Sequence, residues 1–321
     1  MEYISSSSFS LRNTCVTLGK FDGLHLGHRK LFALLEEEKR RSGCQSVVLA
    51  FDFRPGMFQE KKDFRFIYTE EEKKLLLAQA GIDCYISYPV TRETSGMEAE
   101  DFIRQILVEQ LDARLIAVGE DNRFGHNRRG DAAMLRKFSL EGGFRVEALP
   151  KVRLDGETVS STKIREELQR GNLERANAML GAAYHIVGTV EQGRRLGRTL
   201  GFPTLNIIPP AKKLLPPFGV YASVTELGGE RYAGVTNVGV RPTVGQQKRA
   251  WVETHLFDVQ RDCYGELVQT ELLHFLRPEQ SFPDTEALRE QLTRDIAAGR
   301  RYCEEMAQSF PQTVTKIINK L

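Results

Sequence analysis

Apolar and polar residues in the first half of the chain follow two alternating patterns. Short runs rich in β-branched and apolar residues predict strands at 14–18, 46–51, 84–87, 115–118 and 144–149. Between these runs, apolar residues recur every three or four positions and predict helices, the first with Leu31, Leu34 and Leu35 on its buried face. Alternating strands and helices are typical of a parallel sheet with crossover helices, which binds ligands at the carboxyl ends of its strands.

Two further signals concern the helices of this half. Thr69 is followed three residues later by Glu72, and this capping-box pattern predicts a helix start. Another helix is predicted after Ser95, with these apolar residues on its buried face: Phe102, Ile103, Ile106, Leu107 and Leu111.

The pattern changes after a predicted helix at 173–180 that ends at Gly181. Short strands then follow one another at 185–190, 220–226, 232–238, 251–259 and 267–275. Such a series, with Gly228-Gly229 as a two-residue hairpin turn, favours a small antiparallel barrel. The spacing of Leu288, Leu292 and Ile296 predicts an amphipathic helix from Asp284 to about Ala307. We therefore expect an α/β domain at 1–182 and a β domain with a C-terminal helix at 183–321.

Composition narrows the class of protein. The 321 residues include 41% hydrophobic positions, enough for two ordinary cores, and 45 basic residues against 43 acidic ones give a net charge of +2. This balance argues against nucleic acid or an anionic membrane as a partner. No apolar stretch approaches the roughly 18 residues of a membrane span, and five scattered cysteines without a CxxC pair fit a reducing cytoplasm. We expect a cytoplasmic protein that is a monomer or a weak homo-oligomer.

The first candidate site follows the first predicted strand. Gly19 and Gly23 allow a tight turn, and His25 and His28 then lie three residues apart at a helix start. Unpaired backbone N–H groups at a helix start attract anions, so this arrangement suits a nucleotide triphosphate. A capping or packed histidine is the plainer alternative, and a zinc site is disfavoured because no cysteine lies nearby and Leu26 follows His25.

Two more segments of this half follow predicted strands. Residues 119–131 form a loop dense in glycine and arginine, which predicts a nucleotide or flavin contact, although a flexible surface loop has the same composition. Residues 159–165 open a helix whose first turn offers hydroxyls, backbone N–H groups and two cations. Ser160 or Ser161 could also be a simple helix cap.

The second half carries its own candidate site. Residues 193–206 contain three glycines spaced by four, and Thr204 and Asn206 on an extended segment point to one face. Their side-chain oxygens are suitable ligands for Mg²⁺, although a mobile hairpin with arginines in water is an alternative. Glu253 lies on a largely apolar strand, either as a functional carboxylate or as a surface residue of an edge strand.

These motifs resemble a known family. Gly19-x-Phe21-Asp22-Gly23-x-His25-x-Gly27-His28 resembles the HxGH signature of nucleotidyltransferases, and its flanks resemble the bacterial bifunctional riboflavin kinase/FMN adenylyltransferase (FAD synthetase) family. Residues 160–165 resemble the second fingerprint of these nucleotidyltransferases. Residues 193–206 resemble the riboflavin kinase signature GRxLGFPTAN with Leu205 in place of alanine, and the stretches 219–221, 237–243 and 264–265 agree.

The resemblance implies a fold and two activities. The fold is a Rossmann-like HxGH domain followed by a small antiparallel β-barrel. The barrel phosphorylates riboflavin with ATP to give FMN, and the first domain adenylylates FMN with ATP to give FAD and pyrophosphate, with Mg²⁺ as cofactor. Because the phosphate of FMN is already anionic, the second reaction needs no general base, whereas the neutral ribityl hydroxyl benefits from a carboxylate.

The resemblance also implies a role for each matching residue. The catalytic residues are His25, His28 and Glu253, and the Mg²⁺ ligands are Thr204 and Asn206. The expected ATP and phosphate contacts are Gly19, Phe21, Asp22, Gly23, Gly27, Ser160, Ser161, Thr162, Arg165, Gly193, Gly197, Arg198 and Gly201. The expected flavin contacts are Asp121, Asn122, Arg123, Phe124, Asn237 and Arg241.

Three positions depart from the family pattern, all in the first half. Asn122 stands where the family usually has an aromatic residue, Arg54 where a histidine is common, and Val90 where a phenylalanine is frequent. An enzyme with one working domain and a non-enzymatic flavin sensor that binds a partner through its barrel therefore remain as alternatives.

Overall fold

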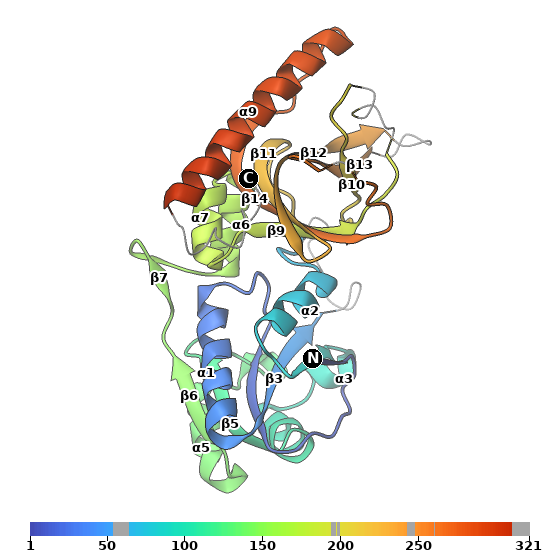
Figure 1. Cartoon of the computed structure of the whole chain (residues 1–321). Coiled ribbons are helices and arrows are strands. Elements are labelled where there is room, and N and C mark those ends of the chain that lie inside the picture. The colour runs from blue at the N-terminus through green and yellow to red at the C-terminus, as the bar shows by residue number, and fades with distance from the viewer. Residues whose placement is uncertain (54–63, 194–196, 198–199, 243–247, 260, 310–321) are drawn as a thin grey trace. The chain divides into compact units, whose positions relative to one another are not determined.

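The computed structural model describes residues 1–53, 64–193, 197, 200–242, 248–259 and 261–309 (Figure 1). The chain divides into two compact units, Met1–Ser161 and Thr162–Leu321. Within the described residues no helix is long and apolar enough to cross a membrane. All five cysteines belong to these residues, and each is a buried free thiol.

The first unit is built on six parallel strands in the order β1-β4-β3-β2-β5-β6. Its strands are β1 (Glu2–Ile4), β2 (Thr14–Gly19), β3 (Gln45–Asp52), β4 (Cys84–Pro89), β5 (Ala113–Gly119) and β6 (Arg145–Leu149), and β7 (Arg153–Leu154) and β8 (Glu157–Thr158) form a separate hairpin. Its helices are α1 (Leu26–Ser42), α2 (Glu70–Gln79), α3 (Arg92–Ser95), α4 (Ala99–Asp101), η1 (Phe102–Gln110), η2 (His126–Arg128) and α5 (Ala132–Gly142), and α6 (Ser161–Arg170) begins at its last residue.

Alternating side chains of the central strand β2 pack on the two faces of this sheet. Val16 and Leu18 face a core that also contains η1 and α5, whereas Cys15 faces a core formed with α1 and α2. Figure 1 shows α1 running alongside the sheet. Helices on both faces of a parallel sheet confirm the predicted doubly wound α/β architecture.

The helix predicted after Ser95 differs in form. The capping box of Thr69 and Glu72 is confirmed at α2, but the later apolar segment is a π-helix, η1, whose end is marked by a hydrogen bond from Leu111 N to Ile106 O at 3.0 Å. The predicted apolar residues are nevertheless buried. The apolar pattern thus identified the buried face but not the wider winding of the helix.

The second unit is an antiparallel sheet of six strands in the order β10-β13-β12-β11-β14-β9. Its elements are α7 (Leu173–Leu180), β9 (Tyr184–Thr189), β10 (Leu205–Ile207), β11 (Gly219–Leu227), β12 (Glu230–Pro242), β13 (Lys248–Leu256), β14 (Leu267–Pro278) and α9 (Thr285–Ser309). The N–H group of Glu191, just after β9, donates to the carbonyl oxygen of Asn206 in β10 at 2.8 Å. This bridge joins the two ends of the sheet, as the predicted barrel requires.

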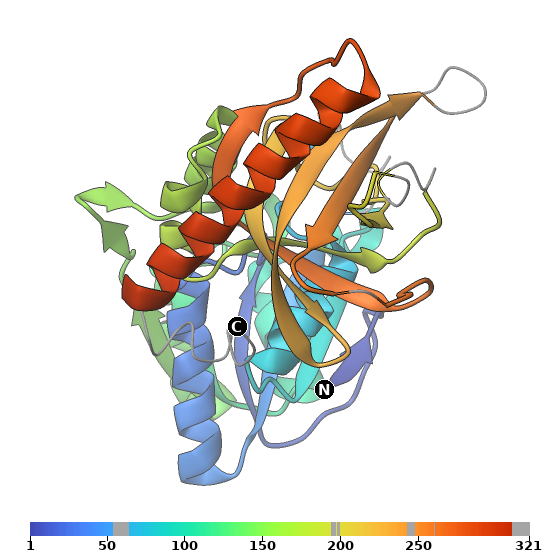
Figure 2. The ribbon, with the colours of Figure 1, turned by 45° about the horizontal axis from the view of Figure 1, so that its top comes forward.

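Helix α9 packs across β11, β12 and β14 (Figure 2). Ile296 packs against the apolar cluster of Val220, Val235 and Phe257. Gly299 permits this close approach, because an added Cβ would lie 2.4 Å from Cγ1 of Val235. The predicted amphipathic C-terminal helix therefore covers one side of the barrel.

Helix α7 packs on β14 and β9 of the barrel. Asn177 donates from Nδ2 to the carbonyl oxygen of Leu272 at 3.0 Å and accepts from the N–H group of Tyr184 at 2.7 Å. The compact units divide at residue 161, whereas the sequence places the domain boundary at residue 182. We propose that the barrel needs α7 for its stability even though its own strands begin after it.

Replacing Asn177 with alanine tests this role of α7. The variant removes both hydrogen bonds of the Asn177 side chain and should lower the free energy of unfolding by about 1–3 kcal/mol. Urea unfolding followed by circular dichroism measures the change. Ala178→Ser, at an exposed position of the same helix, is the matched control. Equal stability of the two variants would show that the two hydrogen bonds of Asn177 contribute little to the barrel.

Candidate active sites

The first site is built by the turn between β2 and α1. The backbone passes through left-handed conformations at Phe21 (φ 48°), Gly23 (φ 88°) and Leu24 (φ 39°). For Phe21 and Leu24 this conformation is unfavourable, and burial of both side chains, with 1% and 3% of their surface exposed, offsets its cost. Packing thus holds the turn that leads into His25, the residue before α1.

The two histidine rings lie one over the other at the start of α1. The ring centroids of His25 and His28 are 3.8 Å apart with planes 16° apart, and the ring of Phe21 lies 5.0 Å from that of His28. Gly27 makes room for this stack, since a Cβ there would lie 3.1 Å from Cε1 of His25. The buried Nδ1 atoms of both histidines have no hydrogen-bond partner within the described part of the chain.

Burial sets the charge of these histidines. Loss of solvation lowers the pKa of His25 to about 4, and it lowers the pKa of His28 well below its usual value, with a further contribution from His25. Both rings are therefore neutral at neutral pH. Neutral rings can still donate an N–H hydrogen bond to a phosphate.

Asp22 and Ser161 tie two parts of this unit together. The hydroxyl of Ser161 donates to the carbonyl oxygen of Asp22 at 2.5 Å, and the carboxylate of Asp22 accepts from the N–H group of Ile67 at 3.0 Å. Ser161 is the first residue of α6, so the start of this helix is fixed to the turn that precedes the histidines. Thr162 and Arg165 follow in the same helix, and their place in the site stays a prediction.

The loop after β5 meets the end of β2. The side-chain amide of Asn122 donates from Nδ2 to the carbonyl oxygen of Leu18 at 2.8 Å. Asp121 is exposed and pairs with Lys151, with 3.0 Å between Oδ2 and Nζ, and its charge opposes the fall in the pKa of His25. This loop therefore lies beside the histidine turn, as expected at the carboxyl ends of neighbouring parallel strands.

The next two residues of this loop differ in exposure. Arg123 is exposed and donates from Nη1 to the carbonyl oxygen of Asn122 at 2.8 Å. Phe124 is 3% exposed, and its ring packs 5.5 Å from that of Phe102 in the core. A flavin contact remains a prediction for both residues, and in this structure Phe124 contributes to the core.

The second site lies on the face of the barrel sheet that α9 covers. Asn206 of β10 is directly opposite Glu253 of β13, and Glu253 is directly opposite Asn237 of β12. Directly opposite residues share a face of the sheet, so their three polar side chains form a row. The same row continues through Val220 of β11 to Arg277 of β14.

This row borders a cavity of about 220 Å³ between the sheet and α9. Apolar side chains dominate its helix side, where Leu288, Leu292 and Ile296 face the opening. The other lining residues are Gly197, Leu200, Phe202, Thr204, Asn206, Val220, Val235, Asn237, Glu253, His255, Arg277, Glu279, Gln280, Phe282 and Asp295. A polar floor under apolar walls suits a flat aromatic ligand with a polar chain.

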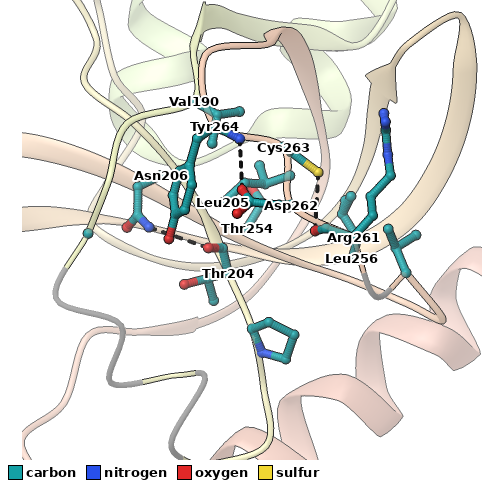
Figure 3. Close-up of a pocket in the computed structure, with 13 residues that line it drawn as sticks. Val190, Thr204, Leu205, Asn206, Thr254, Leu256, Arg261, Asp262, Cys263 and Tyr264 are labelled. Atoms are coloured by element: carbon teal, nitrogen blue, oxygen red, sulfur yellow. Dashed lines mark hydrogen bonds between the residues drawn. The ribbon is translucent and has the colours of Figure 1, made fainter.

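Thr204 and Asn206 also border a second, smaller cavity of about 50 Å³ (Figure 3). Asn206 is only 4% exposed, and its Oδ1 atom has no hydrogen-bond partner among the residues that the structure describes. Its Nδ2 atom lies 3.4 Å from the carbonyl oxygen of Thr204. Tyr264 also lines this smaller cavity (Figure 3). The two cavities thus meet at the two predicted metal ligands.

Glycines around this junction allow close packing. A Cβ at Gly193 would lie 2.6 Å from Nδ2 of Asn206, and one at Gly197 would lie 2.4 Å from the carbonyl oxygen of Phe202. Gly201 has a φ of 87°. Arg198 and Arg54 lie outside the described residues, as does the side chain of Arg241.

Three residues of the barrel site were not among those predicted from the sequence: His255, Arg277 and Asp295. The Nδ1 atom of His255 donates to the carbonyl oxygen of Pro203 at 2.8 Å, which fixes the backbone next to Thr204, and burial lowers the pKa of His255. Arg277 makes two hydrogen bonds to Asp295, at 2.8 and 2.7 Å, and so joins β14 to α9. The two-residue spacing from Glu253 could have indicated His255, because alternate strand residues share a face.

The lowered pKa of His25 predicts a pH dependence of stability. The unfolded chain takes up a proton near the ordinary pKa of 6.5, whereas folded His25 stays neutral down to about 4. Stability should therefore fall as the pH falls from about 6.5 to about 4, and His25 should have no effect above that range. His25→Gln should lose less stability on acidification than the unchanged protein does, as measured by urea unfolding.

NMR titration of the histidine ring nitrogens gives the direct measurement. The signal of His25 should titrate near pH 4, and in the urea-unfolded chain, as the control, it should titrate near the ordinary value of 6.5. A folded-state midpoint near the ordinary value would contradict a buried, neutral pair.

Comparison with known proteins gives a family match for each half of the chain. The model of the FAD synthetase family matches residues 8–163, and the model of the riboflavin kinase family matches residues 180–303. The bifunctional riboflavin kinase/FMN adenylyltransferase of Escherichia coli K12 is 38% identical over 291 residues, which cover 90% of this chain and 92% of that protein. The enzyme of the same name from Haemophilus influenzae is 35% identical over 91% of this chain and 95% of its own length.

Among solved structures, a crystal structure described as a macrolide-efflux protein from Streptococcus pneumoniae has a TM-score of 0.80 and 26% identity. The match covers 92% of this chain and 97% of that one. The two family models match in the order that the sequence motifs predict. The relatives are matched over nearly their full length. The chain belongs to the bifunctional riboflavin kinase/FMN adenylyltransferase family.

Proposed function

We propose that the barrel unit phosphorylates riboflavin and that the histidine site of the first unit adenylylates the resulting FMN. The observation that supports the first assignment best is the row of Asn206, Glu253 and Asn237 on three paired strands. The second assignment is supported by His25 and His28, which meet at a helix start beside the carboxyl ends of parallel strands.

In the barrel, the ring of riboflavin occupies the larger cavity against the apolar side chains of α9. Its ribityl chain then extends along the polar row toward Glu253, and ATP approaches through the smaller cavity on the other side of Thr204 and Asn206. The terminal ribityl oxygen attacks the γ-phosphorus of ATP, and the bond between the γ-phosphorus and the bridging oxygen of ADP breaks. The Glu253 carboxylate takes the proton of the ribityl hydroxyl. FMN and ADP leave.

The side chains of Thr204 and Asn206 fit a hard divalent cation. The Oδ1 atom of Asn206 is buried and has no hydrogen-bond partner in the described ranges, and a hydroxyl and an amide oxygen are suitable ligands for Mg²⁺. When bound together with ATP, Mg²⁺ would neutralise charge on the triphosphate.

The histidine site performs a transfer that needs no base. A phosphate oxygen of FMN attacks the α-phosphorus of ATP, the new P–O–P bond forms, and pyrophosphate leaves with the bonding electrons. Neutral His25 and His28 can donate ring N–H groups to the phosphate oxygens as their charge develops. Gly27 and the Phe21 ring hold the pair in place for this contact.

Two substitutions should separate the activities. Glu253→Ala removes the proton acceptor, so riboflavin phosphorylation should fall by roughly 10²–10⁴-fold, while added FMN is still converted to FAD. His28→Ala should give the reverse pattern, with FMN accumulating from riboflavin and FAD formation reduced by roughly 10²-fold. Incubation with ATP and Mg²⁺ followed by chromatographic separation of the flavins measures both.

Circular dichroism must show that both variants are folded, and Glu253→Gln is the matched control for shape without a proton acceptor. Loss of both reactions in one folded variant would disprove the two-site assignment. Tight FMN binding by the unchanged protein without any turnover would favour the flavin-sensor alternative. An unchanged protein that makes FMN but no FAD would instead indicate one working domain.

Gly193 provides an independent test of the barrel site. Gly193→Ala would place a Cβ 2.6 Å from Nδ2 of Asn206 and should displace this proposed metal ligand. We expect a KM for MgATP in riboflavin phosphorylation that is raised roughly tenfold, and no change in FAD formation from FMN. Gly96→Ala is the control, because a Cβ there meets ordinary contacts of 3.5 and 3.6 Å. An unchanged KM would place Asn206 outside the ATP site.

A further inference from the structure

Asn122 connects the two strands between which the first site opens. The ladder between β2 and β5 has Thr17 and Ala117 as its last pair, after which the chain turns away on either side. Beyond that pair, the side-chain amide of Asn122 donates to the carbonyl oxygen of Leu18 at 2.8 Å. A side chain thus extends the contact between the strands where their backbones separate.

Three of the four polar groups of Asn122 are satisfied within the protein. Its backbone N–H donates to Gly119 O at 2.9 Å, its backbone carbonyl accepts from Arg123 Nη1 at 2.8 Å, and Nδ2 donates to Leu18 O. The fourth group, Oδ1, is buried and has no hydrogen-bond partner across the part of the chain that is described. Buried acceptors in native proteins are rarely left in this state without a reason.

The orientation of this amide is fixed by its neighbour. Leu18 offers a carbonyl oxygen, which can only accept, so the NH₂ group of Asn122 must face it. A flipped amide would bring two carbonyl oxygens together and lose the hydrogen bond. The oxygen Oδ1 is therefore a preset acceptor at the point where β2 and β5 diverge, which is where open α/β sheets bind their ligands.

The chemistry of an acceptor restricts what it can bind. Phosphate oxygens at neutral pH carry no proton to donate, so Oδ1 of Asn122 cannot serve the triphosphate and would repel it. An amide carbonyl instead pairs with an N–H group on the edge of a planar ring, as asparagine does with the amino group of adenine. The two substrates proposed for this site each carry such a group: the imide N–H of the flavin and the amino group of adenine.

We propose that Asn122 is a specificity-determining residue of the adenylyltransferase site, whose Oδ1 atom accepts a hydrogen bond from the imide N–H of the bound flavin or from the amino group of adenine. This proposal rests on the proposed adenylyltransferase function of the first unit.

Two variants separate this contact from the bond to Leu18. Asn122→Leu has a similar volume and removes both the donor and the acceptor, whereas Asn122→Asp loses the donor but keeps acceptor oxygens. Because the bond to Leu18 is absent in both, the loss of that bond alone would not distinguish them, and circular dichroism and thermal unfolding check that the buried carboxylate of Asn122→Asp leaves the fold intact. Riboflavin phosphorylation in the barrel should be unchanged in both and serves as an internal control.

Each variant and the unchanged protein are assayed for FAD formation with two substrate analogues. In 3-methyl-FMN the imide N–H is replaced, and purine riboside triphosphate lacks the amino group of adenine. The unchanged protein should discriminate against one analogue by about tenfold or more in kcat/KM. Asn122→Leu should lose most of that discrimination, and Asn122→Asp should keep most of it. The analogue against which the unchanged protein discriminates identifies the substrate that Oδ1 contacts.

Discrimination against both analogues that is unchanged in Asn122→Leu would overturn the proposal, as would an equal loss in the two variants. If turnover in a variant is too low, the shift in thermal unfolding temperature produced by each natural ligand and its analogue gives the same comparison. The unchanged protein is first assayed with FMN and ATP. If it forms no FAD, the proposed function is disproved, and this result is separate from any result with the variants.

Discussion

The pairing of β-strands is the constraint on which both sites depend. In the first unit the pairing of β2 with β5 ends at Thr17 and Ala117, and the histidine turn and the loop with Asn122 follow beyond that pair. In the second unit the pairing of β10, β13 and β12 runs without a register shift and places Asn206, Glu253 and Asn237 side by side. The histidine site thus lies where the hydrogen bonding between β2 and β5 ends. The barrel site is a row of polar side chains on paired strands.

The two environments also fit the different chemical needs of the two transfers. Burial keeps His25 and His28 neutral, which is sufficient where the attacking oxygen is already an anion and needs only hydrogen bonds and position. Riboflavin offers a neutral hydroxyl, and Glu253 supplies an acceptor for its proton. A single site could not easily satisfy both, because strong desolvation would also discourage the charged form of a carboxylate.

Local motifs made much of this predictable from the sequence. Glycines and fixed spacings act over a few residues and can be recognised in the sequence. They identified the histidine turn, the capping box of α2 and the segment around Thr204. The sequence indicated an extended segment at Thr204 and Asn206, but it did not show that β10, only three residues long, pairs with β13, and it did not show the Arg277–Asp295 pair. These features depend on contacts between distant segments. The apolar spacing of η1 likewise indicated what is buried without indicating a π-helix, since both windings bury the same residues.

Each site also contains an amide oxygen without a hydrogen-bond partner in the described structure, on Asn122 in one unit and on Asn206 in the other. A buried acceptor in this state costs about 1–3 kcal/mol, which the surrounding fold must offset. Because Nδ2 of Asn122 is held by Leu18, this oxygen cannot turn toward another protein group without losing that bond. A ligand that donates a hydrogen bond to this oxygen removes the free-energy cost of the unsatisfied acceptor. A ligand that cannot donate leaves that cost in the complex. Acceptors of this kind make binding selective, because they lose their water when the protein folds and not when the ligand binds.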